Sequence, residues 1–277
     1  MIIKSFDGIR ISYKVKRKGS LFLVFIHGWA ADWTTWKKEI AFFQKKGYST
    51  LTLDLRGHGQ SDKPEEKDKY LLECFAKDIH TVLEKEKIKR VVLIGHSMGG
   101  AISLMYYHLF QNYKNIESFI LCGTTYRNVF QHKKIKILLP FVKQVLDFIL
   151  KNEHINKRHF NHLKDIDLSK YRDSSDYSIF YHGLHNTPLK SVFACLESML
   201  NFDLKKILPK IKSPVLIIEG EKDKILPQAD SIEMHKLIRD AEIVVIPEGK
   251  HGVNIQNPEL VSQKILGFLS KHALKPR

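Results

Sequence analysis

The residue best placed for chemistry in this 277-residue chain is a serine that lies between glycines. Ser97 lies in Gly95-His96-Ser97-Met98-Gly99, between the apolar run Val91–Ile94 and a segment with the pattern of a helix. A sharp strand-to-helix turn exposes such a hydroxyl, and flanking glycines avoid clashes that larger side chains would make. The backbone N–H of Met98 would point at the oxygen of an attacked carbonyl. The pattern therefore predicts a nucleophilic Ser97.

A serine hydroxyl reacts only when a base removes its proton, and a third group must orient that base. His251 follows the apolar run Ile243–Ile246, and Asp223 follows the run Val215–Ile218. If both runs are strands of a parallel sheet, their loops leave the same carboxyl edge as the turn at Ser97, where ligands bind in such sheets. We expect the three side chains to converge, with Glu221 as the reserve acid.

The remaining patterns describe the sheet that must position these residues. Asp7-Gly8 separates two alternating segments and predicts an antiparallel hairpin over 2–16. Continuous apolar runs such as Leu21–Ile26 suit strands buried on both faces, and they alternate with amphipathic patterns such as 72–87. This order predicts an α/β fold with a mostly parallel central sheet flanked by helices. Residues 124–200 break the rhythm, so we expect a helical cap insertion there, with a core made of 1–123 and 201–277.

Five motifs in this order resemble the α/β-hydrolase fold superfamily, in its branch of esterases, lipases and carbon–carbon-bond hydrolases. The motifs are His27-Gly28-Trp29, Asp54-Leu55-Arg56-Gly57-His58-Gly59-Gln60-Ser61, Gly95-His96-Ser97-Met98-Gly99-Gly100, Gly220-Glu221-Lys222-Asp223 and Gly249-Lys250-His251-Gly252. The resemblance implies a catalytic triad of Ser97, Asp223 and His251. It also implies an oxyanion hole made by the backbone N–H groups of Met98 and Trp29.

The function that the resemblance implies is hydrolysis of a small-molecule carboxylic ester through an acyl-enzyme, with no metal or organic cofactor. We expect Trp29, Met98, Phe130 and Phe141 to line the substrate site, and an apolar helix over 135–150 to cover its mouth. Two alternatives stay open. In relatives the same triad performs carbon–carbon-bond hydrolysis, elimination or perhydrolysis, and other relatives are ligand receptors or signalling proteins with slow turnover.

The charge balance bears on partners. The net charge of +15 is spread along the chain: residues 1–123 hold 20 Lys and Arg against 13 Asp and Glu, 124–200 hold 12 against 7, and 201–277 hold 13 against 10. Nucleic-acid-binding modules concentrate such an excess, so we expect no nucleic-acid partner. A positive surface leaves open contact with an acidic carrier protein or an anionic membrane.

Histidines and cysteines give weaker signals. His159 and His162 share a helical spacing, but a catalytic zinc needs three converging ligands and no third is fixed, so we expect no metal site. Cys74, Cys122 and Cys195 are odd in number and widely spaced, which favours a reducing compartment. With no signal-peptide pattern and no apolar run of about 18 residues, a cytoplasmic protein is expected.

Overall fold

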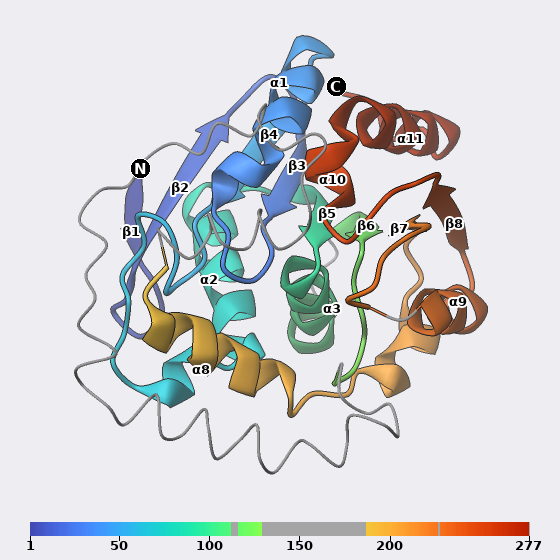
Figure 1. Ribbon diagram of the computed structural model, residues 1–277. Helices are drawn as coiled ribbons and strands as arrows, with labels where there is room; N and C mark the ends of the chain where they lie inside the picture. The colour runs from blue at the N-terminus through green and yellow to red at the C-terminus, as the bar shows by residue number, and fades with distance from the viewer. Residues whose placement is uncertain (112–115, 129–186, 227, 277) are drawn as a thin grey trace.

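An eight-stranded sheet forms the centre of the computed structural model shown in Figure 1, which describes residues 1–111, 116–128, 187–226 and 228–276. The strand order across the sheet is β1-β2-β4-β3-β5-β6-β7-β8. The strands are β1 (Ile2–Lys4), β2 (Arg10–Lys16), β3 (Leu21–Ile26), β4 (Ser49–Leu53), β5 (Arg90–His96), β6 (Ile116–Cys122), β7 (Val215–Gly220) and β8 (Ala241–Ile246).

Pairing follows the two kinds of apolar pattern in the sequence. The alternating segments form the antiparallel hairpin β1–β2, in which Ile2 faces Ser12, and β2 pairs antiparallel with β4. Gly8 has a φ of 89° in the turn between them, a conformation that favours glycine. The six strands from β3 to β8 pair parallel with one another, in the order β4-β3-β5-β6-β7-β8. The predicted α/β fold with a mostly parallel sheet is therefore confirmed.

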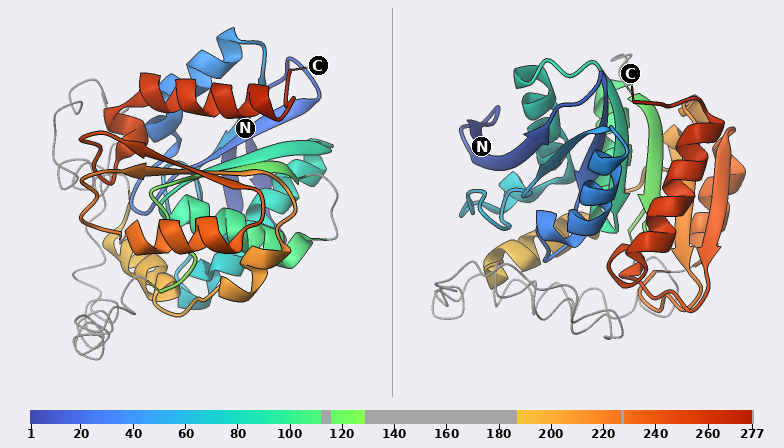
Figure 2. Two further views of the ribbon diagram at one scale, coloured as in Figure 1. Left: turned by 90° about the vertical axis from the view of Figure 1, so that its right-hand side faces the viewer. Right: turned by 90° about the horizontal axis from the view of Figure 1, so that it is seen from above.

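Helices cover both faces of the sheet, so the molecule has three layers (Figure 2). The helices are η1 (Trp33–Trp36), α1 (Lys37–Lys45), η2 (Lys67–Tyr70), α2 (Leu72–Lys85), α3 (Met98–Phe110), α8 (Leu189–Met199), η4 (Lys205–Lys210), α9 (Gln228–Leu237), α10 (Val253–Gln256) and α11 (Pro258–Lys271). The chain enters α1 through the 3₁₀ turn η1, where the Asp32 carboxylate accepts the Thr34 N–H at 2.8 Å.

Each sheet face has its own apolar core. Against α1, α10 and α11, the alternate residues Leu23 and Phe25 of β3 pack with Trp36 and Phe43. The opposite face packs against α2, α3, α8 and α9 and includes Val24 of β3. Because successive residues of a strand point to opposite faces, a strand buried on both sides must be apolar throughout, as β3 is.

The predicted cap, 124–200, is described only at its ends. Phe130, Phe141, the helix expected over 135–150 and the His159–His162 pair lie outside the described residues. Within the predicted segment, α8 buries Ala194 and Cys195 in the core on the side of α2 and α3. The division into core and cap stays a prediction. In the described part of the chain, no helix combines the length and apolar character needed to cross a membrane.

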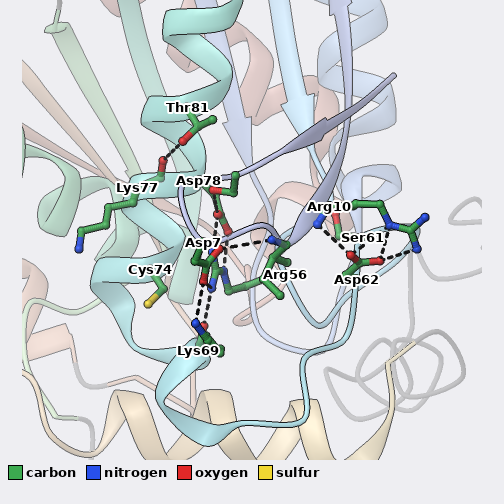
Figure 3. A network of polar contacts seen from close by, with 12 residues as sticks. Asp7, Arg10, Arg56, Ser61, Asp62, Lys69, Cys74, Lys77, Asp78 and Thr81 are labelled. Carbon is green, nitrogen blue, oxygen red and sulfur yellow. Dashed lines mark hydrogen bonds and ion pairs between the residues drawn. The ribbon is translucent and has the colours of Figure 1, made fainter.

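A buried arginine joins the hairpin, the loop after β4, and α2 (Figure 3). The Arg56 side chain is fully buried and donates to Asp78 on α2, with Nε–Oδ2 at 2.7 Å, and to Asp7 in the hairpin turn, with Nη1–Oδ2 at 3.0 Å. Nη1 also donates to the Lys69 carbonyl at 2.9 Å. A buried guanidinium is tolerated only where its donors find such acceptors, so these contacts fix three segments against one another.

Removing Arg56 should destabilise the fold strongly. Arg56→Leu leaves the buried Asp78 carboxylate without its cation, and breaking a buried pair in this way costs about 3–5 kcal/mol. The free energy of unfolding in urea measures the loss. The matched control is Arg10→Leu, because the Arg10–Asp62 pair is solvent-exposed and such pairs contribute little to stability. Equal losses in the two variants would contradict a special role for the buried network.

Candidate active site

Ser97 occupies a strained turn between β5 and α3. Its φ of 52° and ψ of −119° lie outside the regions that residues with side chains usually adopt. A Cβ on Gly95 would lie 2.4 Å from the Gly99 backbone, and a Cβ on Gly99 would lie 2.3 Å from the Ile26 carbonyl oxygen. Glycine is therefore required on both sides of Ser97. Strain held in place by close packing is typical of functional sites.

The three residues predicted to converge do so. The Ser97 Oγ lies 3.0 Å from His251 Nε2, and His251 Nδ1 lies 2.8 Å from Asp223 Oδ2. Since a carboxylate only accepts, the Nδ1 proton of His251 points to Asp223, and Nε2 is left to accept from the Ser97 hydroxyl. This is the arrangement in which imidazole can take a proton from serine.

Asp223 is a buried carboxylate rather than a solvated loop acid. Its side chain is 0% exposed, against 12% for His251. Its other oxygen, Oδ1, accepts the backbone N–H groups of Ile225 at 2.8 Å and Leu226 at 3.0 Å. Burial alone would raise the pKa of Asp223, but the hydrogen bond and charge of His251, together with these two N–H donors, lower it below the usual value. The carboxylate therefore stays ionised beside the imidazole.

The reserve acid has a different environment. Glu221 is exposed, and its Oε2 accepts the backbone N–H of Glu248 at 2.9 Å. The structure thus separates the two candidates that stand two residues apart in the sequence: Asp223 faces the imidazole, and Glu221 faces the turn after β8.

The two predicted oxyanion donors, the backbone N–H groups of Met98 and Trp29, belong to two segments that lie next to Ser97. Met98 is the first residue of α3, where a backbone N–H has no acceptor within the helix. Trp29 follows Gly28, and a Cβ on Gly28 would lie only 3.3 Å from the Ser97 Cβ. The loop after β3, which we call the oxyanion loop (Gly28–Ala30), therefore passes directly beside the nucleophile.

Buried histidines hold the loops around Ser97. His27 Nε2 accepts the Leu55 N–H at 3.0 Å, and His58 Nε2 accepts the Ala30 N–H at 3.2 Å. Burial lowers the pKa of His58 to about 3 and also lowers the pKa of His27. Both rings are therefore neutral near pH 7 and keep an acceptor nitrogen for these bonds.

His96 forms a loop hydrogen bond whose partner could not be identified from the sequence. Its Nε2 lies 2.9 Å from the backbone carbonyl oxygen of His251, 155 residues away. Burial lowers the pKa of His96 to about 3, with a further contribution from the charge of His251. A neutral His96 thus donates to the loop that carries the base. In the sequence, only the position of His96 next to Ser97 marks it as a residue of the site, and this position does not indicate that its partner is the His251 carbonyl.

Glu219 is a second residue that the sequence did not single out. It is the second-last residue of β7, four residues before Asp223. Its side chain is buried, and it accepts a hydrogen bond from the Ser231 hydroxyl. Burial raises the pKa of Glu219 to about 7; the Ser231 hydrogen bond and His251 oppose the rise, whereas Asp223 and Asp230 add to it. A titrating carboxyl group therefore lies beside the Asp223–His251 pair.

Comparison with known proteins identifies the family of this chain. The sequence profile described as "alpha/beta hydrolase fold" matches residues 22–258. The chain belongs to this family. α/β-Hydrolases similar to it include the bifunctional esterase/perhydrolase DCH of Acinetobacter calcoaceticus, which is 24% identical over 95% of this chain and 97% of the relative. Other relatives carry the names epoxide hydrolase and bromoperoxidase, so the family assignment supports a hydrolase without fixing its substrate.

Solved structures share this α/β-hydrolase fold across nearly the whole chain. An esterase from Exiguobacterium antarcticum has a TM-score of 0.76 at 24% identity, covering 98% of this chain and 99% of the esterase. A thermophilic esterase from Thermogutta terrifontis has a TM-score of 0.79 at 22% identity, covering 98% of both chains. At this identity the likeness establishes the fold alone.

The described residues also bear on metal binding. Within them, no three His, Cys, Asp or Glu side chains gather in a way that could hold a metal ion. Cys74, Cys122 and Cys195 are free thiols.

Glu219→Gln should change how stability depends on pH. A carboxyl group whose pKa rises to about 7 in the fold, from 4.5, contributes stability that is present below about pH 4.5 and is lost as pH rises through 7. Glutamine cannot ionise and still accepts from Ser231. The melting temperature of the variant should therefore rise relative to wild type between pH 4.5 and 7.5.

Thermal denaturation across this range measures the effect, and Glu221→Gln is the matched control on the exposed neighbour. A difference between Glu219→Gln and wild type that stays constant with pH would contradict the assignment.

Proposed function

We propose that this α/β-hydrolase cleaves carboxylic esters of small molecules through an acyl-enzyme, with Ser97, His251 and Asp223 as its catalytic triad. One observation carries the proposal: the hydrogen-bonded series from Ser97 Oγ through His251 to a buried Asp223, with 3.0 Å and 2.8 Å between the successive atoms. Esterases among the similar proteins support it.

The first half of the reaction forms the acyl-enzyme. Ser97 Oγ attacks the ester carbonyl carbon while His251 Nε2 takes the hydroxyl proton, which gives a tetrahedral oxyanion and an imidazolium. Asp223 stabilises the imidazolium by accepting from Nδ1. The oxyanion then collapses, the carbon–oxygen bond to the alcohol breaks, and His251 returns its proton to that alcohol as it leaves.

The second half restores the enzyme. Water attacks the acyl carbonyl, His251 takes the water proton, and the collapse of the second tetrahedral intermediate breaks the bond to Ser97, whose Oγ is reprotonated by His251. In both halves the backbone N–H groups of Met98 and Trp29 donate to the oxyanion. Donors already fixed in place need no reorganisation when this charge develops, which is why such groups contribute strongly to rate.

Ser97→Ala should abolish ester turnover in a protein that still folds. Without the nucleophile the expected loss in kcat is on the order of 10⁶-fold, as in other serine hydrolases of this type. A p-nitrophenyl ester series of increasing acyl length measures turnover and also defines the acyl preference. Ser270→Ala on the exposed face of α11 is the control and should match wild type. An active Ser97→Ala protein would refute the mechanism.

Asp223→Asn should lower kcat by about 10⁴-fold, because an amide in place of the carboxylate no longer holds the imidazole in the tautomer that accepts from serine. Glu221→Gln tests the reserve acid in the same assay and should stay within about twofold of wild type. A large loss in Glu221→Gln together with a small loss in Asp223→Asn would transfer the role to Glu221.

A further inference from the structure

The indole of Trp29 lies in an anchored position. Its Nε1–H donates to the backbone carbonyl of Val192 at 2.7 Å. Val192 is 2% exposed in α8, 163 residues away in the chain. The residue that places one backbone N–H beside Ser97 is thus tied by its side chain to a helix of the predicted cap segment.

α8 is held from a second direction. The Tyr70 hydroxyl donates to the Pro64 carbonyl at 2.9 Å and lies 2.8 Å from the Ser191 Oγ. Because the single Tyr70 proton is used by Pro64, Ser191 is the donor to Tyr70. Tyr70 is 1% exposed, so this contact is protected from water. Two adjacent residues of α8 therefore bond to two different segments: Ser191 to η2, and Val192 to the oxyanion loop.

Together with three further hydrogen bonds, these contacts form a closed ring of bonded residues, which we call the circuit. Ala30, next to Trp29, donates to His58 Nε2 at 3.2 Å, and His58 Nδ1 lies 3.0 Å from the Arg56 carbonyl. The Arg56 side chain in turn donates to the carbonyl of Lys69, the residue before Tyr70. From Tyr70 the circuit returns through Ser191 and Val192 to Trp29.

The circuit fixes a loop that is strained. Ala30 has a φ of 51°, in the left-handed region that residues other than glycine seldom adopt. His58 holds the loop at Ala30 and the indole bond holds it at Trp29, so Gly28–Ala30 is restrained on both sides. An oxyanion donor must lie within about 2.7–3.1 Å of the developing charge, so a small rotation of this loop is enough to weaken it.

We propose that the Trp29 indole is a positioning group for the oxyanion hole. Its hydrogen bond to Val192 of α8 keeps the Trp29 backbone N–H at the position where it donates to the oxyanion of the transition state. The proposal rests on the esterase function proposed above. It differs from a role in lining the acyl pocket, because the interaction it describes strengthens only as charge develops on the carbonyl oxygen. Loss of such an interaction lowers kcat and leaves KM nearly unchanged.

The test is Trp29→Phe, which keeps the backbone N–H and an aromatic ring and removes the indole N–H. We expect kcat for the preferred p-nitrophenyl ester to fall by about 10- to 100-fold, with KM within about twofold of wild type. The rate at which a fluorophosphonate probe labels Ser97 should fall in parallel. The melting temperature confirms that the variant is folded.

Trp33→Phe is the matched control. The Trp33 ring lies under Lys14, whose Nζ is 3.4 Å from the ring centroid, and among the described residues its indole N–H has no hydrogen-bond acceptor. This variant loses the same atoms from an aromatic side chain four residues away without releasing α8, so its kcat should match wild type. An equal loss in both variants would overturn the proposal.

Tyr70→Phe provides a second, independent arm. It removes the hydroxyl that accepts from Ser191 and preserves the ring, so α8 is released on its other side. We expect a smaller loss of kcat, again with KM unchanged. A wild-type kcat in both Trp29→Phe and Tyr70→Phe would overturn the proposal, and so would a raised KM with unchanged kcat.

The two proposals fail in distinguishable ways. If wild-type protein is labelled by the probe and hydrolyses esters while Trp29→Phe equals it, only the positioning role is wrong. If wild-type protein is neither labelled nor active on any ester of the series, both proposals are wrong, since the positioning role is defined by that reaction.

Discussion

Parallel pairing of β5, β6, β7 and β8 is the constraint on which the site depends. In this register His96 faces Cys122 and Cys122 faces Ile218, so β5 and β6 end together, and β7 and β8 end together two residues further on, where Gly220 faces Ile246. The loops that follow β5, β7 and β8 leave the same rim and bring Ser97, Asp223 and His251 together. Burial of the Asp223 side chain strengthens its hydrogen bond to His251, because little water competes for the carboxylate.

Burial also decides the charge state of the supporting groups. His27, His58 and His96 lie where desolvation penalises the charged imidazolium, so each pKa falls and each ring stays neutral near pH 7. A neutral ring offers one donor and one acceptor, and the loops around Ser97 use these nitrogens. The Asp223 carboxylate shows the opposite outcome in the same rim, because hydrogen bonds to its charged form outweigh the cost of burying it.

The motif Asp54–Ser61 supports the site without supplying a member of the triad. Asp54 accepts the backbone N–H groups of Trp33 at 3.1 Å and Gln60 at 2.9 Å, which links the turn after the oxyanion loop to the loop after β4. Arg56 connects this same loop to the hairpin and to α2. The buried Asp54, Arg56 and His58 of this motif find hydrogen-bond partners in neighbouring segments, and these bonds restrain the strained loop beside Ser97.

The strands of the sheet and the turn at Ser97 could be predicted from the sequence alone, because they depend on local patterns: β3 is apolar at every position, and the glycines around Ser97 mark a backbone that larger residues cannot follow. The sequence also placed Asp223 and His251 at the correct edge, through strand direction. Three contacts could be found only in the folded protein: Asp223 and not Glu221 faces the imidazole, His96 bonds to the His251 carbonyl, and the Trp29 indole reaches Val192. These contacts join residues that are far apart in the chain, and a local sequence pattern contains no information about such distant partners.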